Sequence, residues 1–121
     1  MKQDTIEFKA GTVIELSFAS VVAGKEGVLF GEYFPQVMPI LADLGGVSLG
    51  SFSIKKSTSD LINPQMSALF QWPNLDAFYA LHKDKRFLAI KDIRDDALCL
   101  LSNGHFFEVK EDMLEYITET L

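Results

Sequence analysis

The sequence predicts a single α+β domain in which helices pack on an antiparallel β-sheet. Two observations support this prediction: short runs in which apolar and polar residues alternate, and longer stretches in which apolar residues recur every three or four positions. The chain has 121 residues, of which 48% are hydrophobic and 23% charged. A chain of this size buries roughly 65% of its unfolded surface in one core. We therefore expect one domain over residues 1–121, with its core at about 12–109 and a C-terminal helix at 110–121.

Alternating side chains predict four strands, at residues 12–20, 47–54, 66–72 and 105–109. In the first strand, Ile14, Leu16 and Phe18 share one face, and Glu15 and Ser17 share the other. Successive side chains of a strand point to opposite sides of the sheet, so only one of these two sets can face the helices. The sequence alone does not decide which set does.

The first helix is predicted at residues 32–44. The double glycine that follows it, Gly45 and Gly46, suits a left-handed C-terminal cap. Pro35 is tolerated if it opens the first turn, whereas Pro39 lies inside the helix. An internal proline removes a hydrogen bond and costs about 3 kcal/mol unless the helix bends. We therefore predict a bent or split helix.

The second helical region follows directly on the third strand. Pro73 cannot donate to a sheet, Asn74 is a suitable N-cap, and Asp84 can cap a second segment. The helical period continues through residues 98–101, and a helix is favoured there because the apolar stripe holds over four turns. The alternative is that 98–101 and 105–109 are two strands joined by an Asn-Gly turn. Cys99, which lies among leucines, is expected to be a small buried hydrophobe.

The resulting order is strand, helix, strand, strand, helix, strand, which is that of a ferredoxin-like four-stranded antiparallel sheet with helices on one face. The face of this sheet away from the helices is not simply polar. It carries Val13, Ala19 and Leu69 in one of the two possible registers, and Phe52 and Ile54 in the other, so apolar residues lie on both faces in either case. An open sheet does not leave both faces apolar in water. We therefore predict a homodimer formed by packing the free faces of two sheets together.

Charge excludes some classes of partner. The net charge is −6 and the isoelectric point is about 4.8, which argues against nucleic acid and against an anionic membrane surface. No run of 18 apolar residues is present, so no membrane-spanning segment is predicted. The opening residues, MKQDTIEFKAG, contain no apolar stretch suited to export. We expect a cytoplasmic protein.

Four residues are candidates for a site. Arg94 interrupts an apolar stripe, so it pairs with a carboxylate, with Glu15 as the candidate, or extends its charged end to solvent, or recognises an anionic ligand. Tyr33 can present a hydroxyl to a pocket near the proline bend, although packing is the simpler interpretation. Trp72 can line a ligand pocket or pack in the core. His105 titrates near neutrality and can act as an acid or base, or can be an exposed residue at a strand end.

Motifs for metal, phosphate or nucleophilic chemistry are missing from the sequence. His82 and His105 are far apart and the single cysteine has no partner, so no zinc pattern is present. His82 precedes Lys83 and is expected to face solvent. The segment GKEG lacks the spacing of a phosphate-binding loop, and no strand–Ser–helix elbow occurs.

Two stretches carry a family resemblance: FQWPNLDAFYALHKDKRFLAI, from residue 70, and YFPQVMPILADLGG, from residue 33. They resemble the dimeric α+β barrel superfamily, which includes the antibiotic-biosynthesis monooxygenases and many small domains of unknown function. The likeness covers roughly residues 12–109. It implies a homodimer whose two sheets face each other and a ligand pocket between each sheet and its helices.

The resemblance also bears on cofactors. Haem-degrading members carry an axial His and a Trp where this sequence has Lys91 and Leu81, so we expect no haem and predict no cofactor. Two function classes stay open. One is a cofactor-independent enzyme, of the oxygenase or isomerase type, acting on a small organic molecule. The alternative is a non-catalytic, small-molecule-binding or stress-related dimeric module. An enzyme needs several polar groups converging in one pocket, whereas a binding module needs only one polar anchor.

Overall fold

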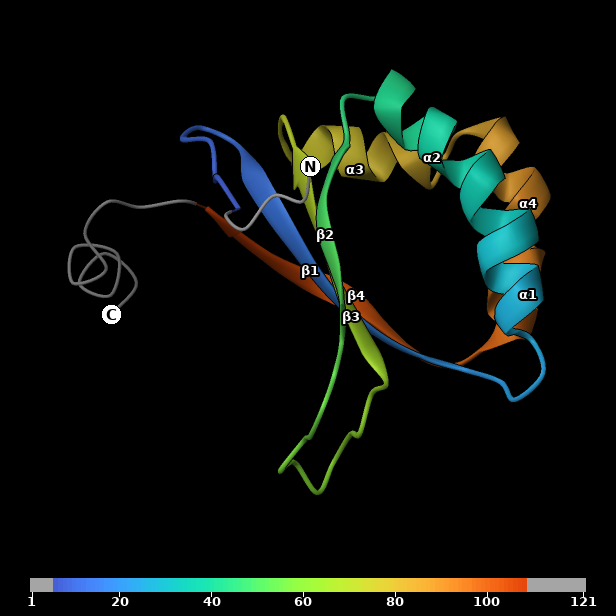
Figure 1. The fold of residues 1–121 in the computed structure, drawn as a ribbon. Helices are drawn as coiled ribbons and strands as arrows, with labels where there is room; N and C mark the ends of the chain where they lie inside the picture. The colour runs from blue at the N-terminus through green and yellow to red at the C-terminus, as the bar shows by residue number, and fades with distance from the viewer. Residues whose placement is uncertain (1–5, 109–121) are drawn as a thin grey trace, which may run out of the picture.

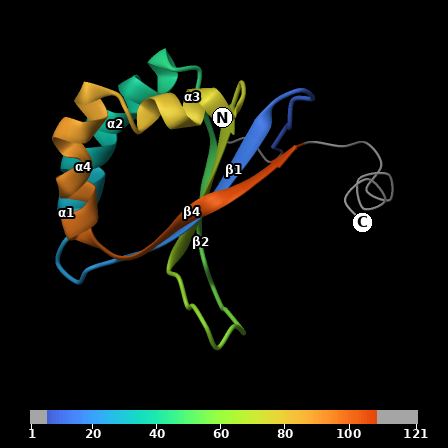
Figure 2. The same ribbon diagram turned by 180° about the vertical axis from the view of Figure 1, so that it is seen from behind.

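The computed structural model describes residues 6–108, which form a four-stranded antiparallel sheet with the helices on one face (Figures 1 and 2). The elements in chain order are β1 (Val13–Val21), α1 (Glu26–Val28), the π-helix η1 (Leu29–Tyr33), α2 (Phe34–Asp43), β2 (Val47–Ser53), β3 (Met66–Trp72), α3 (Leu75–Leu81), α4 (Lys85–Ala97) and β4 (Leu98–Glu108). The strand order is β2-β3-β1-β4. The predicted ferredoxin-like α+β fold is therefore confirmed.

The pairing of the strands fixes which side chains face the helices. β1 lies at the centre, antiparallel to both β3 and β4, and Glu15 pairs with Phe70 on one side and Phe106 on the other. Glu15 and Ser17 contribute to a cavity under the helices. Ile14, Leu16 and Phe18 therefore point to the opposite face, which we call the outer face.

The helix predicted over 98–101 is wrong, because α4 ends at Ala97 and β4 begins at Leu98. Leu98 pairs with Val21, and Leu101 pairs with Ala19. The alternative of two strands and a turn is also wrong, since β4 is one strand that runs through Gly104. The free edge of β1 offers backbone partners to this segment, and such long-range pairing overrides a local helical pattern.

Two irregularities interrupt the pairing of β4 with β1. One lies between the pairs Leu16–His105 and Phe18–Ser102, where β4 carries an extra residue. The other lies next to Cys99. This residue is exposed, with its Sγ 3.5 Å from the backbone oxygen of Ser20, so the expectation that it is buried is wrong.

The first helical region starts at Glu26, before the predicted start at residue 32. Its hydrogen bonding changes from α to π and back to α, and Figure 1 shows the chain curving from α1 into α2. The π segment ends where the backbone N–H of Phe34 donates to the oxygen of Leu29. The next residue, Pro35, has no N–H and cannot donate a backbone hydrogen bond. The π-helical turn therefore lies directly before a position where the helix lacks one backbone hydrogen bond. Pro39 lies within α2, which continues past it.

The predicted caps at Asn74, at Asp84 and at the double glycine after α2 are confirmed, and each is formed by hydrogen bonds between residues close together in the sequence. The side chain of Asn74 accepts from the backbone N–H of Ala77 at 2.9 Å, which caps α3. The carboxylate of Asp84 caps α4 in the same way. At the end of α2, Gly45 has φ +87°, and the N–H of Gly46 donates to the Leu41 oxygen at 2.8 Å.

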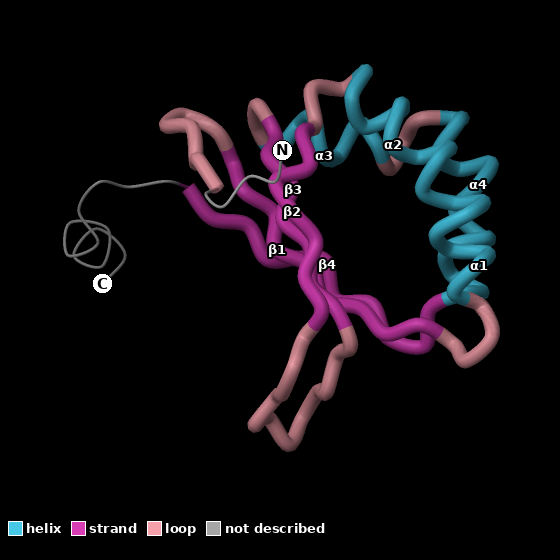
Figure 3. The backbone as a smooth tube through the Cα atoms, viewed as in Figure 1, coloured by secondary structure: helices cyan, strands magenta, loops and turns pink. Residues whose placement is uncertain are grey.

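The helices lie in a layer over one face of the sheet (Figure 3), and the core side chains lie between the two layers. The largest fully buried side chains of this core are Trp72, Phe87 and Leu29, and Ile14 is fully buried on the outer face. Within residues 6–108, no helix is long and apolar enough to cross a membrane. The C-terminal helix predicted at 110–121 lies outside the described residues, and the cytoplasmic location stays a prediction.

Candidate functional site

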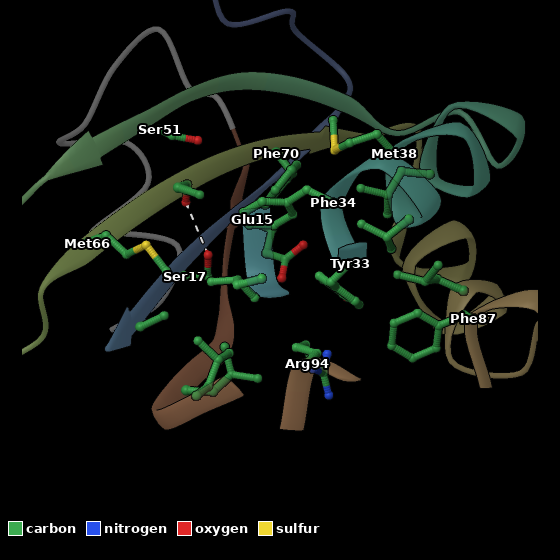
Figure 4. A pocket seen from close by; sticks show the side chains of 18 of the residues that line it. Glu15, Ser17, Tyr33, Phe34, Met38, Ser51, Met66, Phe70, Phe87 and Arg94 are labelled. Carbon is green, nitrogen blue, oxygen red and sulfur yellow. Dashed lines mark hydrogen bonds between the residues drawn. The ribbon is translucent and has the colours of Figure 1, made fainter. Parts of the chain in front are cut away.

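A cavity of about 140 Å³ lies between the inner face of the sheet and the helices (Figure 4). Its walls are mostly apolar and come from all four strands and from η1, α2, α3 and α4. Aromatic rings are prominent in these walls: Phe34, Phe70, Phe78 and Phe87. Polar side chains also contribute to the walls, and Glu15, Tyr33 and Arg94 converge on the cavity from three different elements (Figure 4).

Glu15 is a buried carboxyl group in the middle of the sheet. It is 5% exposed, and its Oε1 accepts a hydrogen bond of 2.9 Å from the indole Nε1 of Trp72. Burial raises the pKa of Glu15, and the Trp72 hydrogen bond and the positive charge of Arg94 oppose that rise. A carboxyl group with a raised pKa in a cavity is suited to give and take protons.

Tyr33 is the last residue of the π-helix and is also 5% exposed. Burial raises the pKa of its hydroxyl, and the charge of Arg94 acts in the opposite direction. The phenol therefore stays protonated at neutral pH and is available as a hydrogen-bond donor. Single π-helical turns within helices occur frequently at functional sites, and here the turn carries a cavity residue.

Arg94 reaches the cavity from the last turn of α4, and its side chain is 13% exposed. The predicted ion pair with Glu15 is not formed. Instead the guanidinium pairs with Asp95 at 3.1 Å and lies 5.4 Å from the ring centre of Phe87. Asp95 is partly solvated, so this pair needs less desolvation than one with buried Glu15. The positive charge of Arg94 opposes the rise in the pKa of both Glu15 and Tyr33, and polar contact between its side chain and the Tyr33 hydroxyl opposes the rise for Tyr33 as well.

His82 also lines the cavity, although the sequence suggested that it faces solvent. Its ring is half-buried against Phe78 and Phe87, with ring centres 4.5 Å and 5.2 Å away. Its Nδ1 lies 3.2 Å from the Phe78 backbone oxygen. A carbonyl oxygen only accepts, so Nδ1 carries a proton in this contact.

The structure thus brings three of the four predicted residues together: Tyr33, Trp72 and Arg94 line one cavity. His105 does not join them. It is exposed on the outer face, where its Nε2 lies 3.0 Å from the Ser102 hydroxyl. Sequence reasoning used Glu15 only as a partner for Arg94 and missed it as a site residue. The available signal was that Glu15 is the single charged residue in β1.

Within residues 6–108, no group of three or more His, Cys, Asp or Glu side chains is placed to hold a metal ion. The polar groups of the cavity lining are one buried carboxyl, one phenol, one guanidinium, one imidazole, the Trp72 indole N–H and the hydroxyls of Ser17, Ser51 and Ser67. These groups are suited to proton transfer and to binding a polar oxygen.

The strand order, the helices on one face and the cavity between them define a ferredoxin-like α+β domain. No protein-family model and no curated protein matches the sequence. Solved structures do match in fold. A NIPSNAP family protein from Agrobacterium tumefaciens is 16% identical, with a TM-score of 0.65, over 91% of this chain and 96% of that one.

Two further structures share the fold. A dimeric protein of unknown function and ferredoxin-like fold from Bacteroides fragilis is 10% identical, with a TM-score of 0.57, over 84% of this chain and 100% of that one. SnoaB, a cofactor-independent oxygenase from Streptomyces nogalater, is 15% identical, with a TM-score of 0.59, over 86% of this chain and 98% of that one. At these identities the likeness concerns the fold, and it confirms the architecture that the family resemblance implied.

Proposed function

We propose that this protein is a cofactor-independent enzyme that moves a proton on a small organic molecule bound in the cavity. The observation that supports the proposal is the convergence of Glu15, Tyr33 and Arg94 in a mostly apolar space. An apolar cavity with a few convergent polar groups and a carboxyl of raised pKa is the usual form of such a site.

In this mechanism the ionised Glu15 removes a proton from an acidic C–H or O–H of the substrate. Negative charge then develops on a substrate oxygen, where the Arg94 guanidinium and the Tyr33 hydroxyl stabilise it. Return of the proton to a different atom completes an isomerisation. In the oxygenase variant, O2 adds to the electron-rich carbon, which is oxidised while O2 is reduced to a peroxide. The Streptomyces neighbour is a cofactor-independent oxygenase, so this fold accommodates chemistry of that class.

The test is exchange of a substrate proton for deuterium. Phenylacetone, which carries an acidic C–H next to a ring, is incubated with the protein in D2O and followed by NMR. We expect exchange above the buffer rate, and a loss of about 10²- to 10⁴-fold in Glu15→Gln, since that is what a general base contributes. Glu32→Gln, an exposed residue of η1, is the control and should exchange like the wild type. Equal rates in wild type and Glu15→Gln would contradict the proposal.

A non-catalytic binding module is the second candidate. It is favoured by the Trp72 hydrogen bond, which already occupies Oε1 of Glu15, and by the mostly apolar walls. In that case Arg94 is the single polar anchor. The protein would then bind small aromatic molecules and show no deuterium exchange above buffer.

We also propose a homodimer formed through the outer face of the sheet. Apolar side chains there remain exposed in the single chain: Val47 is 48% exposed, Phe52 43% and Phe107 36%. Contiguous exposed apolar surface marks an interaction site, and one neighbour of the same fold is described as dimeric.

The dimer is tested by sedimentation equilibrium at micromolar concentration. The wild type is expected at twice the chain mass of 13.5 kDa. Phe52→Lys should shift the equilibrium toward monomer because it charges the outer face. Leu88→Lys is the control, because Leu88 is a similarly exposed apolar residue on α4. A folded wild-type monomer would rule out the dimer.

A further inference from the structure

We infer that the cavity takes a single-ring phenol, with the ring between the aromatic walls and the hydroxyl between Glu15 and Arg94. This inference rests on the proposed function, because it assigns a ligand class to the same cavity. Three properties of the site support it: its volume, the composition of its walls, and the presence of a buried acceptor, Glu15, and a cationic donor, Arg94, in the same lining.

Volume limits the ligand to about one ring. The cavity measures about 140 Å³. In another protein, an apolar cavity of about 150 Å³ binds benzene. A second fused ring would need the walls to move, and these walls include Phe87, which is 1% exposed, and Trp72, which is also 1% exposed. Close-packed walls of this kind resist such expansion.

The walls favour an aromatic ring over an aliphatic one. Phe78 lies among other rings of the lining, with the Trp72 ring centre 5.9 Å away in edge-to-face geometry and the His82 ring centre 4.5 Å away. Phe34 and Phe70 add two more ring faces to the lining. Aromatic pairs in edge-to-face or offset geometry gain energy beyond the apolar area that they bury.

The polar groups select the hydroxyl. Glu15 is an acceptor when ionised, and Arg94 and Tyr33 are donors. A phenolic hydroxyl satisfies both kinds of group, because its O–H donates to the carboxylate and its oxygen accepts from the guanidinium. A benzoate would place a second negative charge beside Glu15, and benzene would leave the buried polar groups without a ligand partner.

The indole of Trp72 provides a direct readout. It is the single Trp in the chain, and its N–H donates to Glu15. One indole N–H signal in a ¹⁵N-labelled sample therefore reports binding at the carboxylate, without any mutation. The full-length chain is titrated at pH 7 with phenol, benzene, benzoate and 1-naphthol in turn.

We expect saturable movement of the indole signal with phenol, and at least tenfold weaker binding of the other three compounds. Arg94→Met should weaken phenol binding by about ten- to a hundredfold, because a hydrogen bond to a charged group is lost. Lys91→Met is the matched control, since Lys91 also lies on α4 and also pairs with Asp95, at 3.5 Å. Tyr33→Phe serves as a second variant if Arg94→Met does not fold.

The outcomes separate this inference from the proposed function. Tighter binding of benzoate or 1-naphthol would overturn the phenol assignment while leaving a ligand cavity in place. A silent indole signal with all four compounds would also overturn it, and the deuterium-exchange experiment would then decide the proposed function by itself. Equal effects of Arg94→Met and Lys91→Met would show that the guanidinium does not contact the ligand.

Discussion

The burial of Glu15 predicts that this protein loses stability as the pH rises. The carboxyl is 5% exposed, and burial is the largest influence on its pKa, which lies above the ordinary value of 4.5. As the pH increases, the unfolded chain therefore loses this proton before the folded chain does. The stability that the protonated carboxyl contributes is complete below the ordinary pKa and is lost as the pH rises through the raised, folded-state pKa.

The size of this effect follows from the linkage between protons and folding. Each pKa unit by which the folded state exceeds the unfolded state corresponds to about 1.4 kcal/mol of unfolding free energy. The structure offers the charged form little compensation: Trp72 donates to Oε1 at 2.9 Å, but Arg94 is paired with Asp95 instead. Ionisation of Glu15 is therefore expected to destabilise the fold.

Glu15→Gln isolates the contribution of this group. Glutamine keeps an oxygen that accepts from Trp72, and it does not titrate. Urea unfolding of both proteins between pH 4.5 and pH 8 gives the difference in unfolding free energy between Glu15→Gln and the wild type. Other titrating groups contribute equally to both proteins, so their contributions cancel in this difference. We expect Glu15→Gln to gain on the wild type as the pH rises and then to level off.

An exposed carboxylate serves as the control for buried Glu15. Glu32→Gln changes an exposed carboxylate of η1 and should show no such pH-dependent gain. If the difference between Glu15→Gln and wild type is independent of pH, burial does not control the Glu15 proton. If the wild type instead gains on Glu15→Gln as the pH rises, the folded-state pKa is lowered and the argument from burial is wrong.

Four further predictions concern stability and cofactor binding. Asn74→Ala should cost about 1 kcal/mol in urea unfolding because α3 loses its N-cap; an unchanged midpoint would show that the cap contributes nothing. Arg94→Met should stay within about 1 kcal/mol of wild type, because the pair with Asp95 is partly solvated and the methionine stem keeps the packing. A loss of several kcal/mol would show that Arg94 compensates buried Glu15 after all. Trp72→Phe should cost at least about 1.5 kcal/mol, since the Glu15 hydrogen bond is lost, and thermal unfolding measures it. Haemin titration should give no saturable Soret shift, and a shift abolished by His82→Ala would contradict that expectation.

Local hydrogen bonds explain what the sequence by itself determined. β3 occupies residues 66–72, as predicted, because its alternating side chains end at Pro73, which cannot donate to the sheet. The caps at Asn74 and Asp84 were predictable because a side chain and a backbone N–H only a few residues apart form each of them. The order of strands and helices followed from these local signals, and it was enough to predict the fold class.

Contacts between distant segments decided the rest. Residues 98–101 have a helical pattern but form a strand, because the edge of β1 supplies backbone partners that no local pattern reveals. Glu15 and Arg94 line one cavity because β1 lies in the sheet and α4 lies in the helical layer that covers it. The sequence could therefore indicate single candidate residues, but it could not predict that they lie together.

His105 shows the same limit at the scale of one residue. Continuing the pairing of Phe18 with Ser102 without interruption would place His105 opposite Glu15, on the inner face. The extra residue in β4 instead pairs His105 with Leu16, on the outer face. A shift of one residue in a strand turns every later side chain to the other side of the sheet. The tertiary pairing, which no periodicity in the sequence encodes, therefore decided that Glu15 and not His105 lies in the cavity.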